Sequence, residues 1–299
     1  IARLRFWLSL IVDEKSPEAL PNLDFKIMQG NSLLEQYKGA DLSTMTENNP
    51  ESGHSITFFD SMLDVYRKNL RDKLSEYYAC PEHDKKVQLR KDIAEIVKQE
   101  LIEQGIRVDF EDLDLSANGQ FFLWHTWFHD VFSRPSKEGF DIVIGNPPYG
   151  AKYDNETKRY YKNTYVTANS IRGLQKGSLD TYTLFIELGY NLLRKNGSFA
   201  YIVPISLTSS DSLTGVHRML MGNCDTIHIS SYAVRPKPVF ENAVVNTSIL
   251  LFQKTGTPCQ HLYSTKMHRR GNEFDLQKLI DTIVEAIDDK KGKGIVSLD

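Results

Sequence analysis

Residues 139–150 read GFDIVIGNPPYG, an apolar run that stops at an asparagine and two prolines. A nearly continuous apolar run of this length is typical of a strand in a parallel sheet, which is covered on both faces. A proline ring fixes φ and removes the backbone N–H, so the strand must end and the chain must turn after Asn146. The stretch therefore predicts an α/β fold with Asn146 just beyond the carboxyl end of a strand, where open α/β sheets bind ligands.

Helical and strand-like patterns alternate after this stretch. Residues 180–195 have the apolar spacing of an amphipathic helix, which we expect to end in a left-handed turn at Asn196. Three strand-like segments follow, at residues 198–207, 227–232 and 247–254. The loop between the last two is short, which favours an antiparallel pair at the end of the sheet. Strands that alternate with helices indicate a mostly parallel sheet with helices on both faces.

The residues before the stretch contain three further helical patterns, one strand, and strand-like material near residues 121–128. Apolar residues recur at helical spacing within residues 4–11, with no cap ahead of them, so we expect the chain to begin inside a domain of a longer protein. Residues 23–30 form a strand-like segment that ends at Asn31. The patterns at residues 56–74 and 89–101, separated by a proline, predict an antiparallel helical hairpin with charged outer faces.

Composition and motif content exclude several classes of protein. The formal net charge of −3 means that contact with nucleic acid must come from a local patch. Cys80, Cys224 and Cys259 form no CxxC pair, which argues against disulfides or a thiolate metal site and suits a reducing cytoplasm. His125 and His129 have neither a third ligand nor an HExxH pattern, so we expect no metal. No apolar run approaches the roughly 20 residues of a membrane span.

The residues after the strand suit a reaction at a nitrogen with a delocalised lone pair, such as the adenine amino group. Such a nitrogen becomes more reactive when both of its protons are accepted in hydrogen bonds. The Asn146 side-chain oxygen and the Pro147 carbonyl are candidate acceptors, and Pro148 restricts the backbone that directs this carbonyl. Tyr149 is placed to stack on a base that has left the duplex. The alternative is that NPPY is only a rigid strand-to-loop turn.

The motif also carries a resemblance to a known family. GFDIVIGNPPYG is similar to the catalytic motif of the γ-type adenine-N6 DNA methyltransferases, especially those in single-chain (type IIG) restriction–modification enzymes. Residues 1–34 resemble the stretch after that family's second cofactor motif. Residues 121–132 resemble the aromatic run before NPPY, and residues 239–256 resemble the loop and final strand. The resemblance covers most of residues 1–256 except the helical hairpin.

The resemblance implies a Rossmann-like S-adenosylmethionine-dependent methyltransferase fold, incomplete at its N-terminus and carrying an inserted helical hairpin. It implies methyl transfer from S-adenosylmethionine to the N6 amino group of adenine in double-stranded DNA, within a restriction–modification system. The family's glycine-rich cofactor loop would precede Ile1, and the chain contains no GxGxxG-like segment. We therefore expect half of the cofactor pocket to lie in a missing N-terminal part of the same polypeptide, and the isolated chain to be inactive.

The resemblance also assigns roles to Asn31 and Phe240. It implies that Asn31 contacts the adenine ring of the cofactor, and that Phe240 and Tyr149 sandwich the flipped adenine. The alternative for Asn31 is that it only caps a helix that begins at Ser32. The alternative for Phe240 is an ordinary loop aromatic packed on the core.

The loop at residues 151–178 interleaves cations with tyrosines, a pattern that suits contact with phosphates and bases of an opened DNA strand. A solvated surface loop has much the same composition. The candidate DNA contacts are Lys152, Lys158, Arg159, Lys162 and Arg172, and the neighbouring tyrosines are Tyr153, Tyr160, Tyr161 and Tyr165.

These patterns predict four parts of the chain. Residues 1–40 are the first part of the methyltransferase domain, residues 41–118 the helical hairpin insertion, and residues 119–257 the catalytic part. We expect residues 258–299, with a helix near residues 273–287, to be a linker and the start of a target-recognition domain. Two alternatives stay open: an RNA adenine or protein glutamine methyltransferase, since an amide nitrogen poses the same chemical problem, and a non-catalytic DNA-recognition fragment.

Overall fold

The computed structural model describes residues 2–13, 27, 29–37, 40–41, 58–103, 122–132, 134–236, 238–240, 244–269 and 296–298. The chain divides into two compact units, Ile1–Ser133 and Arg134–Asp299, and each is described by itself. No helix among the described residues is long and apolar enough to cross a membrane. The four domain boundaries expected from the sequence stay a prediction.

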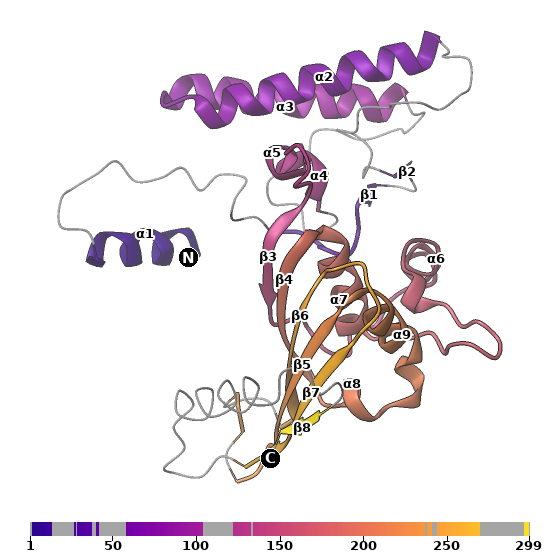
Figure 1. Cartoon of the computed structure of the whole chain (residues 1–299). Coiled ribbons are helices and arrows are strands. Elements are labelled where there is room, and N and C mark those ends of the chain that lie inside the picture. Colours follow the sequence, from indigo (N-terminus) through magenta and orange to yellow (C-terminus); the bar gives the residue numbers. More distant parts are fainter. Residues whose placement is uncertain are drawn as a thin grey trace. The chain divides into compact units, whose positions relative to one another are not determined.

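The first unit contains the helical hairpin (Figure 1). Its elements are α1 (Ala2–Asp13), β1 (Gln36–Tyr37), β2 (Ala40–Asp41), α2 (Phe58–Ala79), α3 (His83–Glu103), α4 (Trp124–Trp127) and α5 (His129–Phe132). The short connection between α2 and α3 makes the two helices antiparallel, and they lie side by side in Figure 1. The two helices expected from the apolar spacing are therefore present, and each is longer than its apolar pattern.

An apolar seam holds the hairpin together. Leu70 and Leu74 of α2 meet Ile93 and Val97 of α3, and all four side chains are almost fully buried. Ion pairs border the seam: Lys73 of α2 lies 3.3 Å from Asp92 of α3, and Lys85 lies 3.0 Å from Glu76. Phe122, Leu123 and Trp127 join the same core, so the aromatic run before NPPY packs on the hairpin. The strand-like structure expected in this run is wrong, because α4 and α5 are helices.

The second unit is built on a six-stranded sheet in the order β3-β4-β6-β5-β7-β8 (Figure 1). The strands are β3 (Phe140–Gly145), β4 (Leu193–Pro204), β5 (Thr226–Tyr232), β6 (Thr247–Gln253), β7 (His261–His268) and β8 (Val296–Leu298). β6 pairs antiparallel with β4 and β5, whereas the pairs β3·β4, β5·β7 and β7·β8 are parallel. All strands of this sheet except β6 thus run in the same direction, which confirms the expected α/β class.

Helices of the second unit cover one face of this sheet. They are α6 (Asn155–Thr164), η2 (Val166–Ala168), α7 (Thr181–Leu192), α8 (Ser206–Ser209), η3 (Asp211–Leu213) and α9 (Thr214–Asn223). Ile186 of α7 and Val216 of α9 are fully buried in one core with Phe199 and Val203 of β4 and Leu250 of β6. This core makes α7 a fixed support beside the strand ends.

Three expectations about this unit need correction. β5 and β6 do form an antiparallel pair, but β6 lies between β4 and β5, so the pair does not end the sheet. Ile142 and Ile144 of β3 keep 66% and 79% of their surface exposed, so the residues that the structure describes do not cover both faces of β3. An apolar run reports a preference for burial but not what covers it. Part of the expected linker forms β7, which extends the sheet beyond β5.

The end of α7 also differs from its prediction. The helix ends at Leu192, and β4 begins at the next residue. Asn196 does adopt the left-handed conformation, with φ of 61°, but it lies within β4 where the register with β3 shifts. The helix expected near residues 273–287 and most of the strand expected at residues 23–30 lie outside the described residues.

Candidate active site

One edge of the sheet collects the segments that the sequence singled out. The carboxyl ends of β3, β4 and β5 lie at this edge because the three strands run in the same direction. Asn146 follows β3 directly, and the loop that contains Phe240 leaves β5 at Tyr232 and enters β6 at Thr247. Thr247 is in register with both Tyr232 and Pro204. The NPPY motif and the Phe240 loop thus share the edge at which open α/β sheets bind ligands.

A hydrogen bond links the asparagine and the tyrosine of the motif. The Tyr149 hydroxyl lies 2.9 Å from Asn146 Oδ1 and 3.2 Å from the Ile202 carbonyl oxygen of β4, and it can donate to either acceptor. A phenol has one proton, so it donates fully to only one of them at a time. Burial raises the pKa of Tyr149, which keeps this hydroxyl protonated at neutral pH.

The backbone around the motif is tightly placed. Pro147 is buried, whereas Asn146 and Pro148 are exposed. A Cβ atom at Gly145 would lie 3.0 Å from the Tyr201 ring, a closer approach than most side chains make, so a larger residue here would require the ring to shift. The Tyr149 ring meets the Tyr182 ring edge-on, with centroids 6.4 Å apart. The asparagine is therefore presented to solvent from a supported turn.

Thr181 and Glu187 of α7 hold the chain that follows the motif. Thr181 Oγ1 accepts hydrogen bonds from the Ala151 N–H at 3.1 Å and the Tyr153 hydroxyl at 2.6 Å. The buried Glu187 carboxylate accepts the backbone N–H groups of Val166 and Thr167, both at 2.8 Å. Neither residue was predicted from the sequence. An acidic residue on the apolar face of the 180–195 helix was an available signal for Glu187.

Asn246 joins two of the loops at this edge and was also missed. Its side-chain oxygen accepts the Val234 N–H at 2.8 Å, and its carbonyl accepts the Ile205 N–H at 3.0 Å. The loops after β4 and β5 are thereby fixed to each other. Phe240 is half-buried in the second of these loops, and its stacking on a base stays a prediction.

The segment after the motif exposes its cations. Lys152, Lys158, Arg159, Lys162 and Arg172 are all exposed, and the first four lie on α6 or just before it. Asp154 caps this helix by accepting the Thr157 N–H at 2.7 Å. The cations are therefore available to phosphates.

Two of the tyrosines in this segment do not fit the expected role. Tyr161 and Tyr165 are 0% and 3% exposed, and their rings pack together with centroids 5.9 Å apart. Both belong to the core that fixes α6 and cannot stack on bases. Helical spacing alone did not separate these buried tyrosines from surface ones.

Asn31 lies in the other unit, within a turn. Its side-chain oxygen accepts the Leu33 N–H at 3.2 Å, an Asx-type turn, and no helix begins at Ser32. The Phe122 N–H donates to the Leu34 carbonyl at 2.8 Å, and the Trp124 indole N–H donates to the Ser32 carbonyl at 2.9 Å. The aromatic run thus fixes the turn of Asn31, whose contact with a cofactor stays a prediction.

His125 has a carboxylate partner in this unit. Its Nδ1 lies 3.2 Å from Glu35, and its backbone N–H donates to the same carboxylate at 3.0 Å. Within the described part of the chain, His, Cys, Asp and Glu side chains form no group of three that could hold a metal ion.

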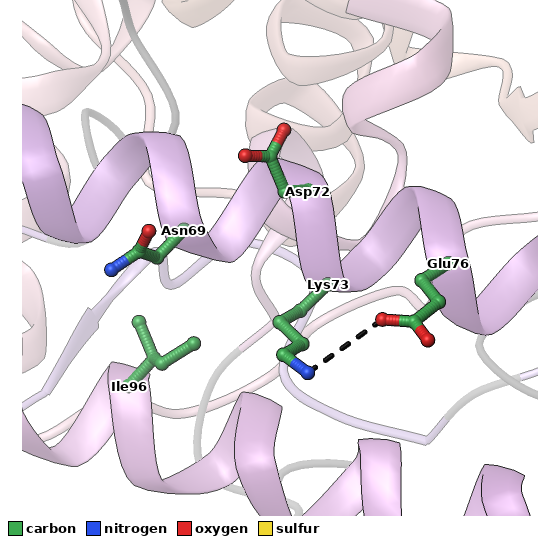
Figure 2. A pocket seen from close by; sticks show the side chains of 5 residues that line it. All are labelled: Asn69, Asp72, Lys73, Glu76 and Ile96. Carbon is green, nitrogen blue, oxygen red and sulfur yellow. Dashed lines mark ion pairs between the residues drawn. The ribbon is translucent and has the colours of Figure 1, made fainter.

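An open hollow of about 330 Å³ lies on the helical hairpin (Figure 2). Its lining residues are Asn69, Asp72, Lys73, Glu76 and Ile96. Figure 2 shows Lys73 directed toward Glu76, with which it forms an ion pair at 3.6 Å. The lining includes none of the predicted site residues, and its Lys73 and Glu76 are paired with each other at the surface. The sheet edge with NPPY is therefore the better candidate site.

Comparison with known proteins identifies related sequences. The family model described as "Eco57I restriction-modification methylase" matches residues 1–240. The type II methyltransferase M.TthHB8I of Thermus thermophilus is 30% identical over 168 residues, which cover 51% of this chain and 34% of that protein. The putative type II restriction enzyme and methyltransferase RM.MjaORFECS2P of Methanocaldococcus jannaschii is 21% identical over 306 residues, covering 85% of this chain and 25% of that protein. The chain spans between 12% and 34% of the length of the curated relatives it matches.

Solved structures show only a distant likeness. A putative class I S-adenosylmethionine-dependent methyltransferase from Listeria monocytogenes is 15% identical, with a TM-score of 0.37 over 78% of this chain and 73% of that chain. The type ISP restriction–modification enzyme LlaBIII bound to DNA is 14% identical, with a TM-score of 0.38 over 93% of this chain and 21% of that chain. TM-scores this low do not assign a detailed fold.

Proposed function

Because the chain belongs to the Eco57I restriction-modification methylase family, we propose that it is the catalytic part of a DNA methyltransferase in a restriction–modification system. The proposed reaction transfers a methyl group from S-adenosylmethionine to the N6 amino group of an adenine in double-stranded DNA. The observation that carries this proposal is the Asn146–Tyr149 hydrogen bond at the carboxyl edge of the sheet, 2.9 Å long. Asn146 Oδ1 accepts this hydrogen bond at an exposed residue, which supports its proposed role as an acceptor for another donor.

The chemistry follows from that acceptor. An adenine amino proton takes the place of the Tyr149 hydroxyl at Asn146 Oδ1. The displaced hydroxyl keeps an acceptor, because the Ile202 carbonyl oxygen is already 3.2 Å away. The Pro147 carbonyl accepts the second amino proton, and the two hydrogen bonds draw the nitrogen lone pair out of conjugation as the new N–C bond forms. Neither acceptor has to move a proton before methyl transfer. The bond between the methyl carbon and the sulfonium sulfur would break as the N–C bond forms, and the methylated amino group would then release one proton to water.

The remaining residues hold the base and the cofactor. Tyr149 and Phe240 stack on the adenine after it has left the duplex. When bound, S-adenosylmethionine supplies a methyl group activated by its sulfonium. The described residues fit only part of S-adenosylmethionine. The turn around Asn31 fixes a polar side chain that suits the adenine ring of the cofactor. The sequence contains no GxGxxG-like segment for the rest of the pocket. We propose that another part of the polypeptide supplies the glycine-rich part of that pocket.

DNA is the proposed partner of the exposed cations. Lys152, Lys158, Arg159 and Lys162 follow the motif on and just before α6, where they can neutralise phosphates next to the flipped base. Phosphate contacts orient the duplex and do not by themselves choose its sequence.

Adenine methylation in cells tests the proposal. The full-length protein is expressed in a host that lacks adenine methylation, and N6-methyladenine in its DNA is quantified beside the Asn146→Ala variant. We expect methylation by the wild-type protein and a loss of at least ~10²-fold in the variant, since it lacks an acceptor used in the transition state. Asn191→Ala removes an exposed asparagine from α7 and should behave like the wild type.

Two results would contradict the proposal. One is full activity of Asn146→Ala. The other is an unmethylated genome despite a folded wild-type protein that binds the cofactor. In the second case, methyl transfer to RNA or to a protein amide by the purified protein would identify the acceptor instead.

A further inference from the structure

The first turn of α7 contacts the NPPY loop on two sides. The Tyr182 ring lies edge-on against the Tyr149 ring, and the Tyr182 hydroxyl lies 2.8 Å from Ser206 Oγ, just beyond β4. The neighbouring Thr181 accepts hydrogen bonds from Ala151 and Tyr153, only two and four residues after Tyr149. One helical turn therefore supports both the motif and the segment that leaves it.

Thr181 is well suited to fix that segment. Its side chain is 2% exposed, so water does not readily replace its bonding partners. A hydroxyl oxygen has two acceptor lone pairs, and the Ala151 N–H and Tyr153 O–H match that capacity. At 2.6 Å, the Tyr153 bond is short for a bond between two hydroxyls. Burial raises the pKa of Tyr153, so its hydroxyl stays protonated and able to donate.

The anchored segment is also held at its far end. The Tyr153 ring packs edge-on against Tyr161, with centroids 4.9 Å apart, and Tyr161 is fully buried. Tyr153 is thus fixed at both its hydroxyl and its ring. The support is rigid as well, because Leu184 and Ile186 of α7 are fully buried. Movement of residues 150–153 relative to the sheet therefore requires loss of the Thr181 hydrogen bonds.

We infer that Thr181 is a positioning residue for the methyl transfer proposed above: its hydroxyl fixes Gly150–Tyr153 and thereby holds Asn146 and Tyr149 against the base. The inference rests on the proposed function. Thr181 touches neither base nor cofactor in this role. Its loss should lower kcat with little change in the KM for DNA, because DNA contacts through α6 remain while the acceptor geometry relaxes.

The test uses Thr181→Val in the full-length protein, with Thr181→Ser as the rescue variant. Thr183→Val is the matched control: Thr183 is a fully buried threonine on the same helix whose hydroxyl donates only to the nearby Asp180 carbonyl, at 2.7 Å. The two hydrogen bonds that Thr181 accepts from Ala151 and Tyr153 form the anchor. Hydrogen exchange of the peptide that contains Ala151 reports directly on the first of them. Steady-state methylation of an oligonucleotide duplex gives kcat and KM.

We expect Thr181→Val to exchange the Ala151 amide faster and to lose roughly 10- to 100-fold in kcat, the scale on which small misplacements act. The kcat values of Thr181→Ser and Thr183→Val should stay within about threefold of the wild-type value, since both variants keep the anchor. Tyr153→Phe removes one of the two donors at a half-buried position and should give a smaller loss, which keeps the test decisive if Thr181→Val folds poorly.

Two outcomes would overturn the inference. One is unchanged exchange at Ala151 in Thr181→Val. The other is faster exchange with an unchanged kcat, which would show a structural contact without a positioning role. Absence of adenine methylation by the wild-type protein would count against the proposed function, whereas the exchange data would still report on the anchor.

Discussion

At the scale of single residues, the proposed function gives the Tyr149 hydroxyl and the Tyr149 ring separable roles. The hydroxyl orients Asn146 Oδ1 in the absence of a base, and the ring is proposed to stack on the adenine. Because the hydroxyl has a second acceptor in the Ile202 carbonyl, its displacement by the adenine amino group leaves no donor without a partner. Substitutions at this position can therefore distinguish orientation from stacking.

Tyr149→Phe should lower kcat by only severalfold, whereas Tyr149→Ala should weaken capture of the flipped base by about 1–3 kcal/mol, the range for stacking of a base on an aromatic ring. Fluorescence of 2-aminopurine at the target position measures extrusion of the base, and steady-state methylation measures kcat. Equal fluorescence and equal rates for the two variants would contradict a stacking role for Tyr149.

At the scale of elements, the junction between α7 and β4 depends on one lysine. No loop separates Leu192, the last residue of α7, from β4, so the helix end needs a donor close by. Lys254 supplies it: Nζ donates to the Leu193 carbonyl at 2.7 Å and lies 3.4 Å from the Asn191 carbonyl and 4.7 Å from the centre of the Tyr190 ring. Burial lowers the pKa of Lys254, which shows that this charge is partly removed from water.

Lys254→Met should reduce the free energy of unfolding by about 1–2 kcal/mol, because it removes a cation and its hydrogen bonds from a helix C-terminus while keeping most of the apolar chain. Lys195→Met, at an exposed position in β4, is the control and should change the free energy of unfolding by less than about 0.5 kcal/mol. Urea denaturation followed by circular dichroism compares the two variants. An equal effect at both positions would refute the capping role.

At the scale of the whole molecule, histidines on β5 and β7 connect stability with pH. Burial lowers the pKa of His228 and, with Lys266 as a smaller contribution, that of His268. The His228 ring stacks on Tyr263 of β7, with centroids 5.1 Å apart. Its Nδ1 is buried with no hydrogen-bond partner among the described residues. The sheet therefore favours the neutral form of these side chains.

The sign of the pH effect follows. Above the ordinary histidine pKa of 6.5, the folded and unfolded chains are both neutral at these positions, and the full stability is present. As the pH falls below that value, the unfolded chain takes up protons that the folded chain does not, so the free energy of unfolding falls until the lowered pKa is reached.

His228→Phe should reduce the loss of unfolding free energy at low pH, because phenylalanine keeps the stacked ring and cannot be protonated. Denaturation midpoints between pH 7.5 and pH 5 measure it for the wild-type and variant proteins. Parallel profiles would show that His228 does not contribute to the acid sensitivity.

The sequence by itself determined the class of fold and indicated the family, whereas the chemistry at the motif stays a prediction. GFDIVIGNPPYG indicated a strand followed by a rigid turn, and the family match agrees with the resemblance drawn from that motif. Asn146, Pro147 and Tyr149 could be named because the chemistry of the motif resides in consecutive residues, whose identity needs no tertiary contact to interpret. The helical hairpin was predictable for a similar reason, since helical periodicity is a local property of the chain.

Only the tertiary structure decided which residues hold the segments around the motif. Thr181, Glu187 and Asn246 act through hydrogen bonds to segments that are distant in the sequence, and no local pattern encodes such partners. Tyr161 and Tyr165 look like surface tyrosines in a basic loop, yet both are buried, because burial depends on which elements pack together. The place of β6 between β4 and β5 was likewise beyond local patterns, since strand order is set by pairing between segments far apart along the chain.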